Sequence, residues 1–237
     1  MLVLFTGGRG SGKSTIARAL YGKLRESGVK FITQSSWRKK SRHVVSKALS
    51  IMYFLMFFRP SLCGVYLQRL YRDIKSGRAR GGLSRLYMPC IFSYHLKSLS
   101  RRADLCVVYD SDFATFAADK VLDGCFDERE VEKYFNRRVL PLVGQLLLVV
   151  CDTPVELAVE RWRDRDNQVL TLAEINEWVR NRTSWKQARQ RVIDVIGPLA
   201  GVTVIKLDGA QTVDSNVEII FKSLSNSSTS DTANNIE

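Results

Sequence analysis

Eight residues near the N-terminus, Gly7 to Ser14, have the types and the spacing of a loop that binds phosphate groups. They read Gly-Gly-Arg-Gly-Ser-Gly-Lys-Ser and fit the pattern G-x-x-x-x-G-K-[ST]. The glycines let backbone N–H groups turn toward a phosphate, which the positive end of a following helix also attracts. An apolar run, Leu2–Phe5, precedes the loop and a helical pattern follows it, as the motif requires. The sequence therefore predicts a nucleotide triphosphate site, with ATP as the expected ligand.

Each part of this loop has an expected role toward ATP and a magnesium ion. We expect Lys13 to reach the β- and γ-phosphates and the Ser14 hydroxyl to bind Mg²⁺. The remaining contacts would come mainly from backbone N–H groups. The residues expected to bind the nucleotide are Gly7, Gly8, Arg9, Gly10, Ser11, Gly12, Lys13, Ser14 and Thr15.

A second group of candidates follows the apolar run Leu105–Tyr109, where Asp110 comes directly after the run and Asp112 two residues later. In open parallel sheets, ligands bind beyond the carboxyl ends of the strands. Asp110 is therefore expected to hold Mg²⁺ or to accept the proton of an attacking hydroxyl. The alternative is that it only caps a strand. Asp152 ends another apolar run, and there a helix N-cap role and a functional role are both open.

Three arginines, Arg161, Arg163 and Arg165, stand at the end of a predicted helix. Arg161 and Arg165 are four residues apart and so share a helix face. Two guanidinium groups on one face can neutralise the charge that spreads over a transferring phosphoryl group. The alternative is a helix end that favours cations and pairs them with Asp164 or Asp166.

Apolar runs rich in β-branched residues alternate with helical patterns, which predicts an α/β domain with a parallel sheet covered on both faces. The expected strands are Leu2–Phe5, Val29–Thr33, Leu105–Tyr109, Leu146–Val150 and Val202–Leu207. The expected helices are Ser14–Ser27, Asp127–Val139, Pro154–Arg165, Leu172–Ile196 and Val213–Leu224. We predict one domain over residues 1–224. The tail Ser225–Glu237, rich in Ser, Thr, Asn and Asp, is predicted to be disordered.

The net charge of +12 is concentrated in one segment. From Trp37 to Arg102 there are 15 Lys and Arg residues and one acidic residue, Asp73. This segment, at about 37–102, is predicted to be a basic, aromatic helical insertion. Its apolar stretch Ala48–Phe58 is shorter than the about 20 residues that cross a bilayer. A helix packed on the domain, an interfacial helix over residues 44–58 on an anionic membrane, and a pocket for an apolar ligand are the alternatives.

Cysteine and histidine usage excludes two other classes of protein. The five cysteines are scattered with no Cys-x-x-Cys pair, so neither a disulfide framework nor a zinc site is indicated. The two histidines have no potential ligands at useful spacing. The apolar N-terminal run is short and lacks a basic segment before it, unlike a signal peptide. We therefore expect a cytoplasmic protein, with peripheral membrane contact as the alternative.

Four elements together resemble the thymidylate kinase-like branch of the nucleoside monophosphate kinase superfamily. They are the loop GGRGSGKST, the strand-Asp element VVYDSD, the element VCDTPVELAVERWRDR and the closing VTVIKLDG. The resemblance implies a three-layer P-loop NTPase fold with a five-stranded parallel sheet. It also implies a lid that carries Arg161 and Arg165 and closes on the ATP phosphates, and an adenine site near Asp208-Gly209.

The sequence departs from this family where the acceptor would bind. Asp110-Ser111-Asp112 stands where the family has Asp-Arg-Tyr or Asp-Arg-His, and Arg9 stands where it has an acidic residue. Thr33–Trp37 replaces an Arg-Glu-Pro-Gly stretch. The basic insertion resembles that of uncharacterised thymidylate kinase-like proteins associated with surface-polysaccharide synthesis, whose expected acceptor is a sugar or a related metabolite. Such an insertion suits an anionic acceptor or one held at a membrane.

Three functions are consistent with these features. The first is an ATP-dependent kinase that transfers the γ-phosphoryl group to a small acceptor, with Lys13, Asp110, Arg161 and Arg165 as its catalytic residues; thymidylate or another nucleoside monophosphate is the alternative acceptor. The second is a P-loop protein that acts on nucleic acid through the basic segment, although no nucleic-acid motif accompanies the charge. The third is a membrane-associated regulator that binds ATP with little turnover.

Overall fold

The computed structural model of the chain describes residues 1–8, 10–33, 106–109, 128–166 and 171–233. Several sequence-based predictions lie outside these residues. They concern Arg9, Asp110, Asp112 and the basic insertion at about 37–102, with its apolar stretch 44–58.

Five parallel strands form one sheet, in the order β2-β3-β1-β4-β5. The central strand β1 pairs with β3 and β4, so that Leu2 lies opposite Val107 on one side and Leu146 on the other. The α/β class with a parallel sheet, predicted from the alternating apolar runs, is confirmed. The strands are β1 (Leu2–Thr6), β2 (Phe31–Thr33), β3 (Cys106–Tyr109), β4 (Leu146–Asp152) and β5 (Val202–Asp208).

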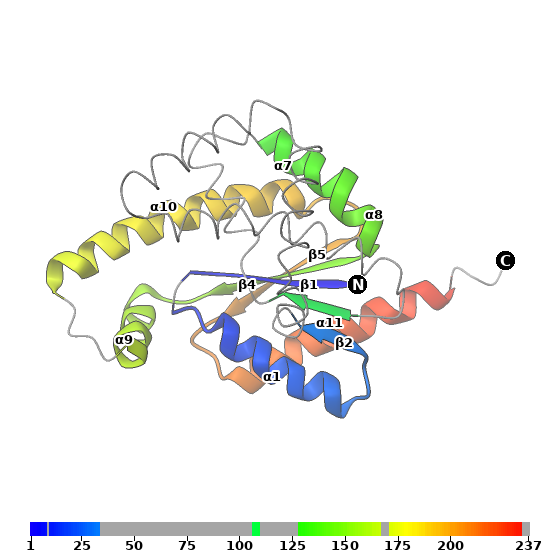
Figure 1. Ribbon diagram of the computed structural model, residues 1–237, viewed down its shortest axis with the longest axis horizontal. Helices are drawn as coiled ribbons and strands as arrows, with labels where there is room; N and C mark the ends of the chain where they lie inside the picture. The colour runs from blue at the N-terminus through cyan, green and yellow to red at the C-terminus, as the bar shows by residue number, and fades with distance from the viewer. Residues whose placement is uncertain (9, 34–105, 110–127, 167–170, 234–237) are drawn as a thin grey trace, which may run out of the picture.

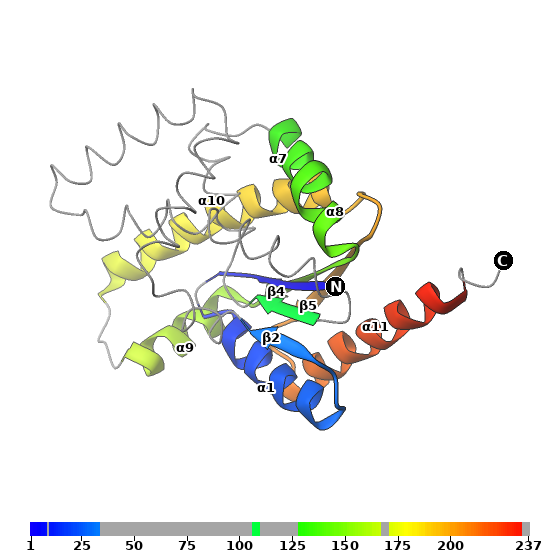
Figure 2. The same ribbon diagram turned by 45° about the vertical axis from the view of Figure 1, so that its right-hand side comes forward.

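Helices cover both faces of the sheet, as Figures 1 and 2 show. Because side chains alternate along a strand, Leu2 and Leu4 pack on one face and Val3 and Phe5 on the other. The first face is covered by α7 (Glu128–Tyr134), a π-helical turn (Phe135–Val139), α8 (Leu140–Val143) and α10 (Leu172–Ile196). The second face is covered by α1 (Lys13–Glu26) and α11 (Val213–Ala233).

One further helix, α9 (Val155–Asp166), follows the carboxyl end of β4 and packs against α10. The rings of Trp162 on α9 and Trp178 on α10 are stacked, with centroids 5.4 Å apart. A capping box fixes the start of α10, because Thr171 Oγ1 accepts from the Glu174 N–H at 3.3 Å and the Glu174 carboxylate accepts from the Thr171 N–H at 2.8 Å. These contacts set α9 and α10 relative to each other at the edge where the strands end.

The chain's last helix differs from the prediction. Helix α11 continues to Ala233, so that residues 225–233, which we predicted to be disordered, are helical. The Thr212 hydroxyl caps its start by accepting from the Ser215 N–H at 3.2 Å. Ser223 and Ser225 donate to carbonyl groups four residues earlier, each at 3.1 Å, so these hydroxyls bond within the helix.

The helix predicted over Asp127–Val139 is interrupted in the structure by the π-helical turn Phe135–Val139. Pro141 follows in the first turn of α8. Proline has no N–H group and clashes with the carbonyl group four residues before it, which the wider π turn accommodates. Among the described residues, no helix combines the length and the apolar composition needed to cross a membrane.

Candidate nucleotide-binding site

The P-loop (Gly7–Ser14) joins the central strand β1 to helix α1. Gly12 is the N-cap of α1 with φ 79°, and its carbonyl accepts from Thr15 N at 3.0 Å and Ile16 N at 2.9 Å. As a glycine, the N-cap residue has no side chain of its own to cap this helix end. The first N–H groups of a helix have no acceptor within it, and they carry its positive dipole end. The loop therefore lies where the backbone can bind an anion, as predicted from the motif.

The P-loop packs so tightly on β4 and α9 that two of its glycines have no room for a side chain. A Cβ on Gly7 would lie 2.6 Å from the Cys151 carbonyl oxygen. A Cβ on Gly10, whose φ is 78°, would lie 2.5 Å from the Ala158 carbonyl oxygen. Both contacts are with backbone atoms, which cannot swing aside. The glycines of the motif are thus required by packing as well as by the loop's conformation.

Lys13, the first residue of α1, directs its ammonium group into the P-loop. Its Nζ donates to the carbonyl oxygens of Gly8, at 3.1 Å, and Gly7, at 2.5 Å. The side chain is half-buried, and the charge lies against the loop backbone and not in bulk water. This is where a cation can reach phosphate groups bound by the loop N–H groups.

Ser11 is a buried polar residue in the middle of the P-loop, only 1% exposed. Its carbonyl accepts from the Thr153 hydroxyl at 3.3 Å, which joins the loop to the residue after β4. Its own Oγ has no hydrogen-bond partner within the described part of the chain. Buried polar atoms without partners are uncommon, and a site for an ion or a ligand is one usual reason. The orphaned hydroxyl thus suits a loop that binds a polar ligand.

The first turn of α1 offers an oxygen ligand for a magnesium ion. Ser14 follows Lys13 directly and is exposed. Mg²⁺ is usually held by one or two protein oxygens together with substrate phosphates and water. Within the described residues, no three His, Cys, Asp or Glu side chains gather as a protein cage would require. Ser14 therefore fits an ion that arrives with a nucleotide; Asp110, the second predicted ligand, lies outside the described residues.

Arg161 lies between the P-loop and the loop that follows β5. Its Nη2 donates to the Gly209 carbonyl at 3.0 Å, and a Cβ on Gly12 would lie 3.6 Å from its Nη1. The adjacent Trp162 is buried and stacked on Trp178, which fixes this turn of α9. Of the predicted arginines, the structure brings Arg161 to the site. The loop at Asp208-Gly209, predicted to lie near adenine, is at the same place.

The other two arginines of α9 are not brought to the P-loop by any contact in the described residues. Arg163 is exposed, and for Arg165 only the helical backbone is described. The chain around them is a continuous helix to Asp166. The lid inferred from the family resemblance thus stays a prediction for Arg165.

A residue that sequence reasoning missed, Arg182 on α10, lies beside the P-loop. A Cβ on Gly8 would lie 3.5 Å from Arg182 Nη1, and its Nη2 donates to the Thr153 carbonyl at 2.7 Å. The guanidinium also lies over the Trp178 ring, 5.0 Å from its centroid. No local pattern marks this arginine, because its place depends on how α10 docks across the end of β4.

The surroundings of Arg182 are unusual for a charged group. Burial is the main cause that lowers its pKa, and the positive charge of Arg189 lowers it further. The carboxylates of Asp152 and Glu156 act in the opposite direction. An arginine stays protonated at neutral pH despite such a shift. The site therefore holds a permanent, partly dehydrated positive charge next to the P-loop, where an anion is attracted more strongly than in water.

Solved structures with a similar fold include two kinases. Its structure is similar to deoxyadenosine kinase from M. mycoides with products dCMP and a flexible dCDP bound, with a TM-score of 0.51, 16% identity and coverage of 95% of this chain and 100% of that one. Shikimate kinase from Aquifex aeolicus vf5 also aligns, with a TM-score of 0.42, 15% identity and coverage of 97% and 99%. No protein-family model matches the sequence, and no curated protein matches it either.

Proposed function

We propose that the chain is an ATP-dependent kinase that transfers the γ-phosphoryl group of ATP to a small acceptor. The observation that carries the proposal is the convergence of three cations from three helices on one glycine-rich loop. Lys13 comes from α1, Arg161 from α9 and Arg182 from α10. Phosphoryl transfer needs positioning and charge neutralisation more than covalent help, and this arrangement supplies both.

The roles of these residues follow from their positions. The loop N–H groups and the Lys13 ammonium would bind the β- and γ-phosphates, because both lie at the N-terminus of α1. Arg182 would face the transferred group from the side of α10 and offset the charge that develops on it. Mg²⁺, when bound with ATP, would draw charge from the phosphate oxygens, and Ser14 would be its protein ligand. Asp110 stays a predicted ligand or base.

The finer assignment is to the thymidylate kinase-like branch, with a sugar or a phosphorylated metabolite as acceptor. The motifs that support it lie on elements around the site: the element VCDTPVELAVERWRDR spans β4 and α9, and VTVIKLDG forms β5 and its following loop. The altered Asp110-Ser111-Asp112 element favours an acceptor other than thymidylate. Thymidylate or another nucleoside monophosphate is the alternative acceptor. The roles in nucleic-acid or membrane binding rest on the basic insertion and stay predictions, as does the cytoplasmic location.

The test is turnover of ATP·Mg²⁺ by purified protein against nucleoside monophosphates and a panel of sugars, measured as ADP formed. We expect Lys13→Ala to lower turnover at least about 100-fold, because a transition-state cation is lost, and to leave the fold intact. Lys23→Gln, at the far end of the same helix, is the matched control and should retain wild-type turnover. A folded Lys13→Ala protein with near-normal turnover would contradict the proposal.

A further inference from the structure

Trp162 on α9 and Trp178 on α10 form a stacked pair of rings between the two helices. The ring centroids are 5.4 Å apart, and the ring planes are 28° from parallel. Trp162 is 9% exposed and Trp178 is half-buried. Figures 1 and 2 show α9 and the start of α10 at the same end of the molecule. Aromatic pairs at this separation stabilise a contact beyond the burial of their area, so the pair fixes one helix against the other.

The Trp178 ring also lies against the guanidinium group of Arg182, one turn later on α10. The guanidinium carbon is 5.0 Å from the ring centroid, which is within the range of a cation–π contact. The two residues are four apart, the spacing at which side chains on a helix meet. A second contact joins Arg182 Nη2 to the Thr153 carbonyl at 2.7 Å. The guanidinium is therefore held from two directions, by an aromatic ring and by a carbonyl beside the P-loop.

The stacked pair connects two arginines that lie at different parts of the P-loop. Arg161 directly precedes Trp162 on α9 and donates to the Gly209 carbonyl at 3.0 Å. Arg182 lies against the Trp178 ring on α10. Because the two rings stack, a change in the angle between the helices would move both guanidinium groups relative to the loop. The pair is therefore placed to fix the positions of these cations as well as to bury apolar area.

We propose that Trp178 is a positioning residue that holds the Arg182 guanidinium ready for the transferred phosphoryl group. The proposal rests on the proposed kinase function, in which Arg182 faces that group. A long side chain that is free to rotate must lose this freedom in the transition state, whereas a side chain that is already ordered does not. Trp178 therefore acts on kcat more than on the KM for ATP, because the P-loop and Lys13 bind the ground-state nucleotide.

The first test is steady-state turnover of ATP·Mg²⁺ by Trp178→Leu and Trp178→Phe, with the acceptor that gives the most ADP. We expect Trp178→Leu to lower kcat about 3- to 30-fold, which is the loss of a cation–π contact expressed as a rate, and to leave the KM for ATP near its wild-type value. Trp178→Phe keeps an aromatic face for Arg182 and should recover most of the loss. The control is Val179→Ala, which shortens the next, half-buried residue; it should lower the melting temperature and leave kcat unchanged.

A double-mutant cycle separates positioning from packing. If Trp178 acts through Arg182, Trp178→Leu lowers kcat in the wild-type background and has no further effect in Arg182→Gln. If Trp178 only packs the two helices together, the two losses multiply. Should Trp178→Leu not fold, Trp178→Phe gives the same comparison with a smaller effect, because it keeps a ring that can stack on Trp162.

A binding measurement tests the same role without an acceptor. Titration calorimetry compares the binding of ADP·Mg²⁺ alone with its binding in the presence of aluminium fluoride, a mimic of the phosphoryl group in transit. A group that is preorganised for the transition state contributes to binding of the mimic and not to binding of ADP. We expect Trp178→Leu to weaken binding with aluminium fluoride about 3- to 30-fold and to leave binding of ADP alone unchanged.

Three results would overturn the proposal. They are wild-type protein that binds ADP no more tightly with aluminium fluoride, binding of the mimic that is equal in Trp178→Leu and wild type, and kcat losses that multiply with those of Arg182→Gln. Each of them leaves the kinase proposal standing, because that proposal depends on Lys13. Conversely, normal turnover in Lys13→Ala would refute the kinase mechanism in a protein that keeps both tryptophans.

Discussion

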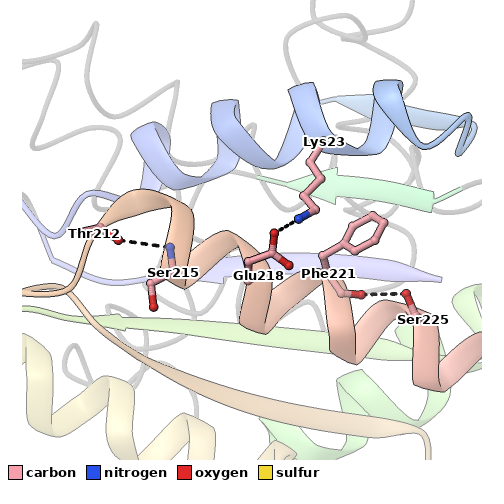
Figure 3. A network of polar contacts seen from close by, with 6 residues as sticks. All are labelled: Lys23, Thr212, Ser215, Glu218, Phe221 and Ser225. Carbon is pink, nitrogen blue, oxygen red and sulfur yellow. Dashed lines mark hydrogen bonds and ion pairs between the residues drawn. The ribbon is translucent and has the colours of Figure 1, made fainter.

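The two faces of the sheet use positive charge in different ways. On the face covered by α1 and α11, Lys23 forms an ion pair with Glu218, which Figure 3 shows. The Lys23 Nζ also lies 5.0 Å from the centre of the Phe221 ring. On the face covered by α10, Arg182 donates to the Thr153 carbonyl beside the P-loop, and burial lowers its pKa. The first face carries an ion pair that joins two helices, and the second holds a partly buried cation beside the P-loop.

The two faces differ because their charged residues lie at different distances from the edge of the sheet where the strands end. Lys23 lies in the last turn of α1, far along the helix from Lys13, and its pair is partly exposed, with side chains 28% and 51% exposed. Such a pair links two helices and has little other consequence. Arg182 lies against Gly8 and Thr153, where burial keeps water away. Excess positive charge at a loop that binds anions favours a ligand, and the same charge elsewhere would only destabilise the fold.

The largest effect is expected from Arg182→Gln. We expect kcat to fall about 100- to 1000-fold, because a preorganised donor facing the transferred group is lost. The free energy of unfolding should also fall, because the guanidinium loses its hydrogen bond with the Thr153 carbonyl and its contact with the Trp178 ring. Steady-state kinetics with ATP·Mg²⁺ and thermal unfolding measure the two effects. The control is Arg180→Gln, which changes an exposed arginine two residues earlier. Equal losses of kcat in both variants would contradict a special role for Arg182.

Sequence patterns predicted the parts of this molecule that depend on neighbours in the chain. The P-loop is a continuous motif, and the strands are continuous apolar runs, so both were found at their observed places. Arg161 was found because it stands four residues from Arg165 on a helix. Arg182 could not be distinguished from Arg180, nor Arg189 from Arg191, because their different surroundings arise only when α10 packs on the sheet.

In the C-terminal segment, residues 225–233, amino-acid composition alone gave the wrong secondary structure. Its Ser, Thr and Asn residues predict disorder when counted alone, yet they continue a helix that is already formed. That helix is anchored on the sheet by Val217, Ile220 and Leu224, and their burial offsets the free-energy cost of helix nucleation. Once a helix is nucleated, adding a residue costs far less than beginning a new one. The composition of residues 225–233 therefore did not predict their structure, because the packed residues before them determine that the helix continues.

A smaller effect is expected from Lys186→Gln. Lys186 binds Asp152, the residue before Thr153, and so holds α10 near the turn that bears Arg182. We expect kcat to fall several-fold and unfolding free energy to fall by no more than about 1 kcal/mol, because both side chains are more than half exposed. Asp152→Asn should have the same effect, and the double variant should be no worse than either. Additive losses in kcat would show that the pair does not act through Arg182.

The smallest effect is expected on the opposite face, from Lys23→Gln and from Glu218→Gln. Each change removes one partly exposed ion pair, which contributes about 0.2–1 kcal/mol to stability. For Lys23→Gln, loss of the contact with Phe221 adds a similar amount. Thermal unfolding should therefore show a melting temperature a few degrees lower in Lys23→Gln than in Glu218→Gln, while kcat and KM for ATP stay at wild-type values. If instead either variant lowered kcat, α11 would be coupled to the P-loop through α1, and the two faces would not be separate in function.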